Sequence, residues 1–228
     1  MKAIVLADGD EPDRAGLDAA WPDWSHGIDL VVAADGGARL AAPLGLGLDA
    51  WVGDGDSTGD EALAAIAAGG TTVRRVDAAK DESDTELAVL EAVGRGADDI
   101  VILGALGGQR FDHAFANIGL LAMPQLAGLR VELLDEQTRV RLIAAPDASG
   151  GPVRLPLPGR VDELVSLLPF GSGVGGVTTD GLAYPLDDEP LPPGPARGLS
   201  NVRTSASAAV TVRSGRLLVI ETPATLVE

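Results

Sequence analysis

The sequence predicts an α/β N-terminal domain with a mainly parallel sheet, followed by a small all-β sandwich domain. Three features lead to this prediction: apolar strand-like runs alternate with helix-like stretches over the first 145 residues, a loop-forming segment follows at 146–152, and only short β-like runs come after it. We therefore expect one domain over residues 1–145 and a second over residues 151–228.

Within the first 145 residues, each apolar run has the length of a strand. Between two of these runs, Ser83 followed three residues later by Glu86 is a capping-box signal, and Leu87, Leu90 and Val93 then recur on one helical face. Repeated alternation of strand and helix predicts a parallel sheet covered by helices on both faces. The expected strands are 3–7, 30–34, 50–53, 72–76, 100–103, 130–134 and 140–144, and the expected helices are 61–68 and 85–93.

The second domain shows short β-like runs and no convincing helix. Turn-forming segments at 169–173, 187–198 and 214–215 separate these runs, and the proline-rich stretch 190–195 is expected to be a surface loop. Such a pattern is typical of a sandwich or barrel. The expected strands are 163–168, 174–179, 206–212 and 217–221.

Composition excludes several classes of function. The 228-residue chain has a net charge of −17, which argues against nucleic acid or an anionic membrane as the main partner. It contains no cysteine, so disulfides, thiolate catalysis and zinc–thiolate sites are excluded. The apolar run 3–7 is too short for the core of a signal peptide, and no segment approaches the length of a membrane span. We therefore expect a soluble, cytoplasmic protein.

Acidic and glycine-rich motifs follow several of the predicted strands. Asp35-Gly36-Gly37 follows the run 30–34, and Gly53-Asp54-Gly55-Asp56-Ser57 follows the next run. Ligands bind at the carboxyl edge of an open α/β sheet, and the two-residue spacing directs the carboxylates of Asp54 and Asp56 to the same side. An acidic pair is common by chance in so acidic a chain, but the flanking glycines would let the backbone approach a ligand closely.

A second acidic motif, Lys80-Asp81-Glu82-Ser83-Asp84, precedes the predicted helix 85–93. Asp81 and Asp84 could simply cap this helix and complement its dipole. Combined with Asp35, Asp54 and Asp56, they are better explained by a metal site. Because only oxygen ligands are offered, the expected ion is Mg²⁺, which commonly binds one or two carboxylates together with substrate phosphate oxygens.

A glycine-rich segment with an arginine follows the run 100–103. Gly107 and Gly108 could present N–H groups to phosphate, and Arg110 offers a bidentate fork. Asp112 and His113 are expected to begin the next helix, with Asn117 one turn further on. His113 is either a structural residue at the start of this helix or part of a binding pocket with Arg110 and Asp112. The spacing is not that of a P-loop, and neither a dinucleotide-binding glycine motif nor a serine-hydrolase elbow is present.

Taken in order, these motifs closely resemble those of the bacterial thiamine pyrophosphokinases. The resemblance rests on D-G-G, G-D-x-D-S, K-D-x-[ST]-D-x-E and G-G-x-R-x-D-H-x-x-x-N, and it continues through the segments 176–186 and 198–201. It implies transfer of a diphosphate from ATP to the thiamine hydroxyl, giving thiamine diphosphate and AMP. It also implies a nucleotide-binding α/β domain, a thiamine-binding β-sandwich, and a homodimer with thiamine near the subunit interface.

The resemblance also implies roles for individual residues. Asp54, Asp56 and Asp84 would hold Mg²⁺, and these three residues, together with Arg110 and Asp112, would be catalytic. Arg110 and Asp112 match positions at the junction of ATP and thiamine. Substrate contacts would come from Asp35, Gly36, Gly37, Ser57, Asp81, Gly107, Gly108, His113, Asn117, Ser200 and Asn201.

Two other functions are compatible with parts of the sequence. A related diphosphokinase acting on a pterin alcohol would share the handling of ATP and metal, although the segments 181–186 and 198–201 favour thiamine. A non-catalytic nucleotide or thiamine sensor would keep the fold, but all the expected carboxylates are present. We therefore expect an enzyme.

Overall fold

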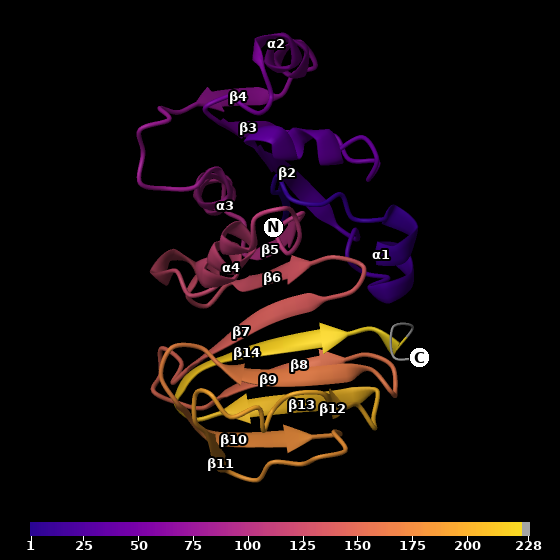
Figure 1. The fold of residues 1–228 in the computed structure, drawn as a ribbon, viewed down its shortest axis with the longest axis vertical. Helices are drawn as coiled ribbons and strands as arrows, with labels where there is room; N and C mark the ends of the chain where they lie inside the picture. Colours follow the sequence, from indigo (N-terminus) through magenta and orange to yellow (C-terminus); the bar gives the residue numbers. More distant parts are fainter. Residues whose placement is uncertain (225–228) are drawn as a thin grey trace. The chain divides into compact units, whose positions relative to one another are not determined.

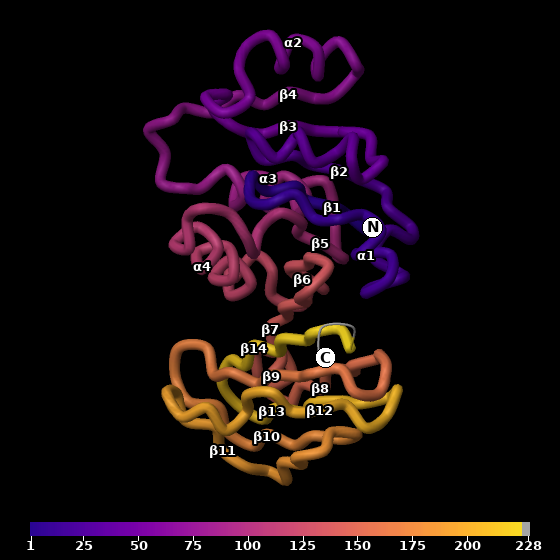
Figure 2. The backbone as a smooth tube through the Cα atoms, turned by 45° about the vertical axis from the view of Figure 1, so that its right-hand side comes forward, coloured from indigo at the N-terminus to yellow at the C-terminus, as the bar shows by residue number. Residues whose placement is uncertain are grey.

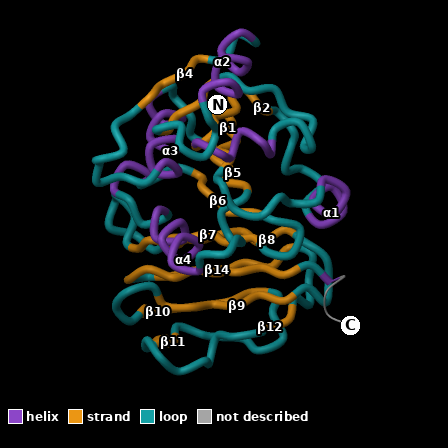
Figure 3. The backbone as a smooth tube through the Cα atoms, turned by 45° about the horizontal axis from the view of Figure 1, so that its top comes forward, coloured by secondary structure: helices purple, strands orange, loops and turns teal. Residues whose placement is uncertain are grey.

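The computed structural model describes residues 1–224, which form parts of two compact units, Met1–Glu136 and Gln137–Glu228. Figure 1 shows the first unit in indigo to magenta and the second in orange to yellow. The four labelled α-helices all belong to the first unit, and the second is built mainly of strands (Figure 3). The predicted fold class is confirmed. No helix among the described residues is long and apolar enough to cross a bilayer.

The first unit contains a parallel sheet with the strand order β6-β5-β1-β2-β3-β4. All its neighbouring strands run parallel. The chain builds outward from β1 to β4 and then places β5 on the other side of β1, so the strand order reverses between β1 and β5. Ligands of open α/β sheets bind at such a point. The strands are β1 (Lys2–Leu6), β2 (Ile28–Ala34), β3 (Ala50–Gly53), β4 (Thr72–Arg75), β5 (Asp99–Leu103) and β6 (Arg130–Leu134).

The helices of the first unit are α1 (Arg14–Ala20), α2 (Asp60–Ala68), α3 (Asp84–Gly94) and α4 (Phe111–Leu120), with 3₁₀ helices η1 (Asp35–Leu40) and η2 (Pro124–Leu126). Helix α3 begins as predicted: the Ser83 hydroxyl accepts a hydrogen bond from the Glu86 N–H (3.1 Å). Helix α1 was not predicted. It has only seven residues, too few for a clear apolar period, and begins at the capping carboxylate of Asp13.

Three buried tryptophans anchor the core of the first unit. Trp51, on β3, is fully buried, and its indole N–H donates to the carbonyl of Asp35 (2.9 Å). The indoles of Trp21 and Trp24 donate to the Asp135 carbonyl and the Asp18 carboxylate, each at 2.7 Å. Each ring is therefore buried with its polar atom satisfied. The bond from Trp51 ties the end of β3 to the end of β2, where the acidic motifs begin.

The second unit is a sandwich of two antiparallel sheets, ordered β12-β9-β14-β7 and β11-β10-β13-β8. Its core includes Val165 and Leu167 from one sheet and Val177 and Val210 from the other, which is the alternating burial expected of packed sheets. The strands are β7 (Arg139–Ala145), β8 (Val153–Pro158), β9 (Leu164–Pro169), β10 (Val174–Asp180), β11 (Glu189–Leu191), β12 (Asn201–Val202), β13 (Ser207–Val212) and β14 (Gly215–Thr222).

Strand β7 belongs to the second unit, because it pairs antiparallel with β14 from Arg139↔Glu221 to Ala145↔Gly215 (Figure 2). The expected division after residue 145 lies beyond this strand. Three further strands, β8, β11 and the two-residue β12, were not predicted. Pro156, Pro158 and Pro190 lie within β8 and β11, which are both edge strands, where a missing N–H donor is tolerated. The stretch 190–195, expected to be a surface loop, therefore begins within β11.

Candidate active site at the ends of the parallel strands

Three carboxylates come together at the carboxyl ends of β2 and β3. One oxygen from each of Asp35, Asp54 and Asp56 lies within 4.8 Å of the other two. Asp35 follows β2 directly, and Asp54 and Asp56 follow β3, which is hydrogen-bonded to β2 in parallel. We call these three residues the carboxylate cluster. A group of oxygen ligands at this spacing suits a hard divalent cation.

Asp35 is the buried member of the carboxylate cluster and is held by its neighbours. It lies at the start of η1 with a φ of 39°, an uncommon value for a residue with a side chain. Its Oδ2 accepts from the Ser57 N–H (3.2 Å), and its Oδ1 accepts from the Thr58 hydroxyl (2.9 Å). A Cβ at Gly53 would lie 2.8 Å from the Asp35 Cβ, so glycine is required for this approach. The Asp35 carboxylate is therefore fixed before any ligand binds.

Asp54 and Asp56 are linked to each other across Gly55. Asp54 Oδ1 accepts from the Asp56 N–H (3.0 Å), and this bond lowers the pKa of Asp54. The pKa of Asp56 is raised, because hydrogen bonding to Asp35 and Asp54 and the charge of Asp54 favour its protonated form. The raised pKa of Asp56 thus reflects neighbouring carboxyls, whose crowding a bound cation would relieve.

Lys80 pairs with Asp84 beside the carboxylate cluster. Its Nζ donates to Asp84 Oδ1 (2.6 Å) and lies 3.8 Å from Asp54 Oδ2. Burial lowers the pKa of Lys80, but the hydrogen bond to Asp84 and the charges of Asp84 and Asp54 outweigh it, so that the pKa is raised overall. The sequence predicted Asp84 as a metal ligand with Asp54 and Asp56. It also combined Asp35 with them in one metal site. The structure groups the oxygens of Asp35, Asp54 and Asp56 and pairs Asp84 with Lys80 beside them.

The two glycines after Asp35 are buried rather than open to a ligand. A Cβ on Gly36 would lie 2.4 Å from the Asp8 carboxylate, and one on Gly37 would lie 2.2 Å from the Leu6 carbonyl oxygen. Burial raises the pKa of Asp8, an effect opposed by its ion pair with Arg39 at 3.2 Å. Gly36 and Gly37 therefore allow η1 to pack closely against the end of β1.

The loop after β5 contacts the loop after β1, where the strand order reverses. The Gly108 N–H donates to Asp10 Oδ2 (2.8 Å), and a Cβ on Gly107 would lie 2.4 Å from the same oxygen. The carbonyl of Ala105 accepts from the Asn117 side chain on α4 (3.0 Å). The N–H group that was expected to face a phosphate thus already holds an anionic oxygen, that of Asp10.

Arg110 and Asp112 form an exposed ion pair at the start of α4. Arg110 Nε donates to Asp112 Oδ1 (3.1 Å), and a second guanidinium nitrogen pairs with Oδ2. This interaction lowers the pKa of Asp112 and raises that of Arg110. His113, the next residue along the chain, is exposed. Asp81, in the loop before α3, is exposed as well. The structure brings Arg110 and Asp112 together, but with each other rather than with the carboxylate cluster.

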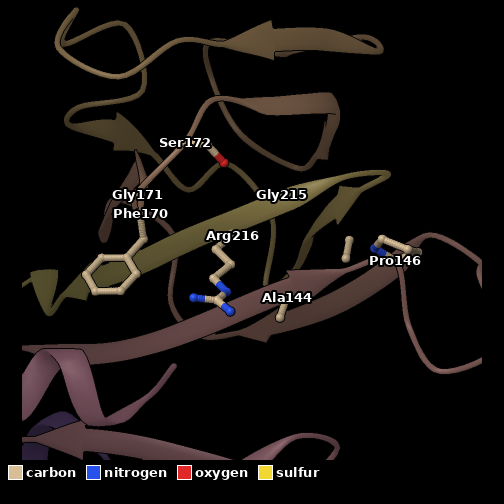
Figure 4. A pocket seen from close by; sticks show the side chains of 8 residues that line it. Ala144, Pro146, Phe170, Gly171, Ser172, Gly215 and Arg216 are labelled. Atoms are coloured by element: carbon tan, nitrogen blue, oxygen red, sulfur yellow. The ribbon is translucent and has the colours of Figure 1, made fainter. Parts of the chain in front are cut away.

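Ser200 and Asn201 lie in the second unit beside β9. Ser200 is exposed with a φ of 54°, and its N–H donates to the Ser166 hydroxyl (3.0 Å). Asn201 is buried, and its amide bonds to the backbone of Tyr184. A separate hollow in the same unit lies between the ends of β7, β9 and β14 (Figure 4). None of the predicted site residues line it; its lining includes Ala144, Pro146, Phe170, Ser172 and Arg216.

Sequence reasoning missed several residues that contact the predicted ones. Thr58 follows the G-D-x-D-S motif and orients Asp35, while Asp8 and Asp10 follow β1. A signal for the last two was available, because Asp8-Gly9-Asp10 also stands at the end of a strand. Lys80 was part of a quoted motif but received no role, since the sequence does not show that its ammonium lies between Asp54 and Asp84.

Comparison with known proteins assigns the chain to a family. Residues 23–133 match the family described as thiamin pyrophosphokinase, catalytic domain, and residues 153–219 match thiamin pyrophosphokinase, vitamin B1 binding domain. The chain belongs to the thiamine pyrophosphokinase family. The carboxylate cluster lies within the catalytic-domain match, and Ser200 and Asn201 lie within the vitamin B1 binding match.

Relatives and solved structures agree with this assignment. Thiamine pyrophosphokinase of Bacillus subtilis is 26% identical over 175 residues, covering 74% of this chain and 75% of the relative. The crystal structure of the Bacillus subtilis protein has a TM-score of 0.80 at 24% identity, covering 98% of this chain and 99% of that one. A thiamin pyrophosphokinase family protein from Enterococcus faecalis has a TM-score of 0.79 at 25% identity, with 97% and 99% covered.

Proposed function

We propose that the carboxylate cluster is where this chain, a member of the thiamine pyrophosphokinase family, transfers a diphosphate group from ATP to the hydroxyl of thiamine. The products are thiamine diphosphate and AMP. The observation that carries the proposal is the convergence of Asp35, Asp54 and Asp56 within 4.8 Å at the ends of two parallel strands, inside the catalytic-domain match. A pterin-alcohol diphosphokinase and a non-catalytic sensor are not favoured by the comparisons.

The residues of the cluster fit Mg²⁺. They offer oxygen ligands only, and the crowding that raises the pKa of Asp56 would be relieved by a divalent cation. We assign Asp35, Asp54 and Asp56 to the ion. Asp84 lies beside them, paired with Lys80, and would reach the ion only if this ion pair opened. When bound, Mg²⁺ would neutralise and orient the phosphate groups of ATP. Thr58 and the Ser57 N–H keep the Asp35 carboxylate oriented.

The remaining predicted residues are assigned to the substrates. The oxygen of the thiamine hydroxyl forms a bond to the β-phosphorus of ATP, the bond from that phosphorus to the bridging oxygen breaks so that this oxygen leaves with AMP, and the hydroxyl proton passes to water. We assign Arg110 to the transferred phosphates and Asp112 to orienting the hydroxyl, which requires their ion pair to open. Ser57, Asp81 and His113 are assigned to the nucleotide side, and Ser200 to thiamine. Gly107 and Gly108 are also assigned to the nucleotide, which requires the Gly108 N–H to leave the Asp10 carboxylate. Asn117 supports the loop after β5 through Ala105.

The chain is proposed to act as a homodimer with thiamine near the subunit interface. Phe111 and Phe115 on α4 are 80% and 59% exposed, and their rings lie 6.2 Å apart next to Arg110 and Asp112. Exposed aromatic side chains of this kind are typical of protein interfaces.

If the sites are shared between subunits, mixing the impaired variants Asp56→Asn and Asn201→Ala restores part of the activity after subunit exchange. A monomer by sedimentation, or no recovery after demonstrated exchange, contradicts the shared site.

AMP release tests the proposed reaction directly. With ATP and Mg²⁺, purified protein is expected to form AMP and thiamine diphosphate in equal amounts when thiamine is present. It is expected to form neither when a 6-hydroxymethyl-pterin replaces thiamine, and EDTA should abolish turnover. AMP formation with the pterin alone would contradict the assigned substrate, and thiamine binding without any AMP formation would identify a sensor.

A further inference from the structure

The hollow between the ends of β7, β9 and β14 lies apart from the segments that resemble thiamine-binding ones (Figure 4). Phe170 lines the hollow and directly follows β9, whereas Asn201 pairs with Val165 near the start of that strand. A strand rises about 3.3 Å per residue, so roughly 16 Å of backbone separates these two positions. The segment 181–186 likewise follows the end of β10, whereas the start of β10 lies next to the loop before β14. The hollow is therefore at the opposite end of the sandwich from these segments.

Strand pairing places Arg216 between Ala144 on β7 and Phe170 after β9. Arg216 is in register with Ala144, and its carbonyl accepts a hydrogen bond from the Phe170 N–H (2.8 Å). Side chains at paired positions of neighbouring strands lie on the same face of a sheet. Figure 4 accordingly shows the Arg216 side chain between the Phe170 ring and Ala144. The small Ala144 side chain leaves space beside the guanidinium, and the aromatic ring borders it on the other side.

The guanidinium of Arg216 has no anionic partner. It forms no ion pair or hydrogen bond with any residue that the structure describes. The exposed arginines Arg154, Arg197 and Arg213 of the same unit, by contrast, each pair with a carboxylate. The carboxylate of Asp147, in the loop after β7, accepts hydrogen bonds from its own loop. The positive charge in the hollow is therefore left for a ligand.

The loop after β9 adds neutral hydrogen-bond donors to the hollow. Gly171 and Ser172 line it, and both residues are exposed. Within residues 1–224, their N–H groups and the Ser172 hydroxyl have no hydrogen-bond partner. Backbone N–H and hydroxyl groups beside a guanidinium are the donors that anions bind. The hollow has a volume of about 460 Å³, which is within the range of small-molecule sites.

We propose that this hollow is a second ligand site, separate from the carboxylate cluster and from the segments that resemble thiamine-binding ones, and that its ligand is a small anion attached to a flat ring. A nucleoside monophosphate has this chemistry. Its base stacks on Phe170, and its phosphate accepts from the Arg216 fork and from the donors of Gly171 and Ser172. Binding here goes beyond the proposed function, because it requires neither thiamine nor turnover.

Fluorine labelling of the phenylalanines tests this site directly. The chain contains three phenylalanines, so protein labelled with 4-fluorophenylalanine gives three ¹⁹F resonances, and Phe170→Leu identifies that of Phe170. AMP, added without thiamine, is expected to shift the Phe170 resonance saturably. Adenosine lacks the anion and inorganic phosphate lacks the ring, so each should bind at least about tenfold more weakly. Phe111 and Phe115, next to Arg110, report separately on the proposed active site.

Two results of this titration would overturn the proposal. One is a Phe170 resonance that stays in place at millimolar AMP, even if the Phe111 and Phe115 resonances move. That result would leave the proposed function intact and confine AMP to the first unit. The other is equal binding of AMP and inorganic phosphate at Phe170, because the ring would then contribute nothing.

Arg216→Gln tests whether the shift arises in the hollow itself. The side chain is exposed and unpaired, so the fold should not change. The Kd for AMP measured at Phe170 is expected to rise at least about tenfold, since a charge-assisted contact is lost, while the response of Phe111 and Phe115 stays the same. Arg154→Gln, which removes another exposed arginine of the same unit, is the matched control and should leave the Kd unchanged. An unchanged Kd in Arg216→Gln would show that Phe170 responds to binding elsewhere and would refute the site.

Discussion

Each unit of the molecule contains a group of charged side chains, but the two groups differ in net charge and in how deeply they are buried. The carboxylate cluster of the first unit joins Asp35, Asp54 and Asp56, with one nearby ammonium that is already paired to Asp84. The second unit places Arg203 and Glu221 in its core, both 0% exposed, with Glu163 beside them. The first group has excess negative charge and reaches the surface at Asp56, whereas the second pairs opposite charges away from water.

This difference separates a site from a structural element. The Glu221 carboxylate accepts from Arg139, Arg141 and Arg203, at distances between 2.5 and 3.0 Å. Its bonding is complete within the second unit. The carboxylate cluster instead has oxygens close to one another with too little positive charge beside them, an arrangement that a cation would complete. Perturbing each group should therefore affect different properties: stability in one case and turnover in the other.

The largest effect is expected from Glu221→Gln. Removing the carboxylate leaves the guanidinium of Arg203 buried without its principal partner, which costs about 3–5 kcal/mol of unfolding free energy for a broken buried pair. Urea denaturation followed by circular dichroism measures this loss. A change below about 1 kcal/mol would show that the buried group is not a structural element.

The pH dependence of the same variant sharpens the comparison. Burial raises the pKa of Glu221, but Arg141 and Arg139 outweigh it, so that its folded-state pKa lies below the usual 4.5. The ionised carboxylate thus contributes stability that is fully present above pH 4.5 and is lost as the pH falls through the depressed pKa. The difference in unfolding free energy between wild type and Glu221→Gln should be constant near neutrality and shrink in acid. A difference that grows on acidification would contradict this sign.

Changes in the carboxylate cluster should affect turnover instead. Asp54→Asn or Asp56→Asn is expected to reduce kcat by at least about a hundredfold, the scale for losing one electrostatic element of a transition-state clamp. Stability should be unchanged or higher, because one of several crowded carboxylates is removed. Glu61→Gln, an exposed acid in the first turn of α2, is the control and should retain activity. Near-normal turnover of both cluster variants at ordinary Mg²⁺ would contradict the site.

The smallest effect is expected for an exposed ion pair. Arg154 and Asp180 approach to 2.6 Å, but both side chains are 55% exposed. Asp180→Asn should lower the unfolding free energy by less than about 1 kcal/mol, since water and salt screen such a pair. The same urea titration measures this loss. If Asp180→Asn lowered the unfolding free energy as much as Glu221→Gln, burial would not explain why the two ion pairs differ in their contribution to stability.

Much of the fold could be predicted because its elements are encoded locally. Strands such as Ala50–Gly53 and Asp99–Leu103 are largely apolar runs of the right length, and Ser83 with Glu86 marks the start of α3. Local signals failed where a partner decides the outcome. Val153–Pro158 forms a strand despite two prolines because it lies at a sheet edge, and Arg139–Ala145 belongs with β14, whose first residue, Gly215, comes 70 residues after Ala145.

The sequence by itself determined the class of chemistry: its acids and glycines at strand ends indicate oxygen ligands and phosphate at the edge of a parallel sheet, and their order matches the thiamine pyrophosphokinase family. Only the tertiary structure decided which of these residues meet. It paired Asp84 with Lys80 and the Gly108 N–H with Asp10, and turned the amide of Asn201 toward the backbone of Tyr184. The physical reason is that spacing along a strand fixes the face on which a side chain lies, whereas its partner depends on strand pairing and burial.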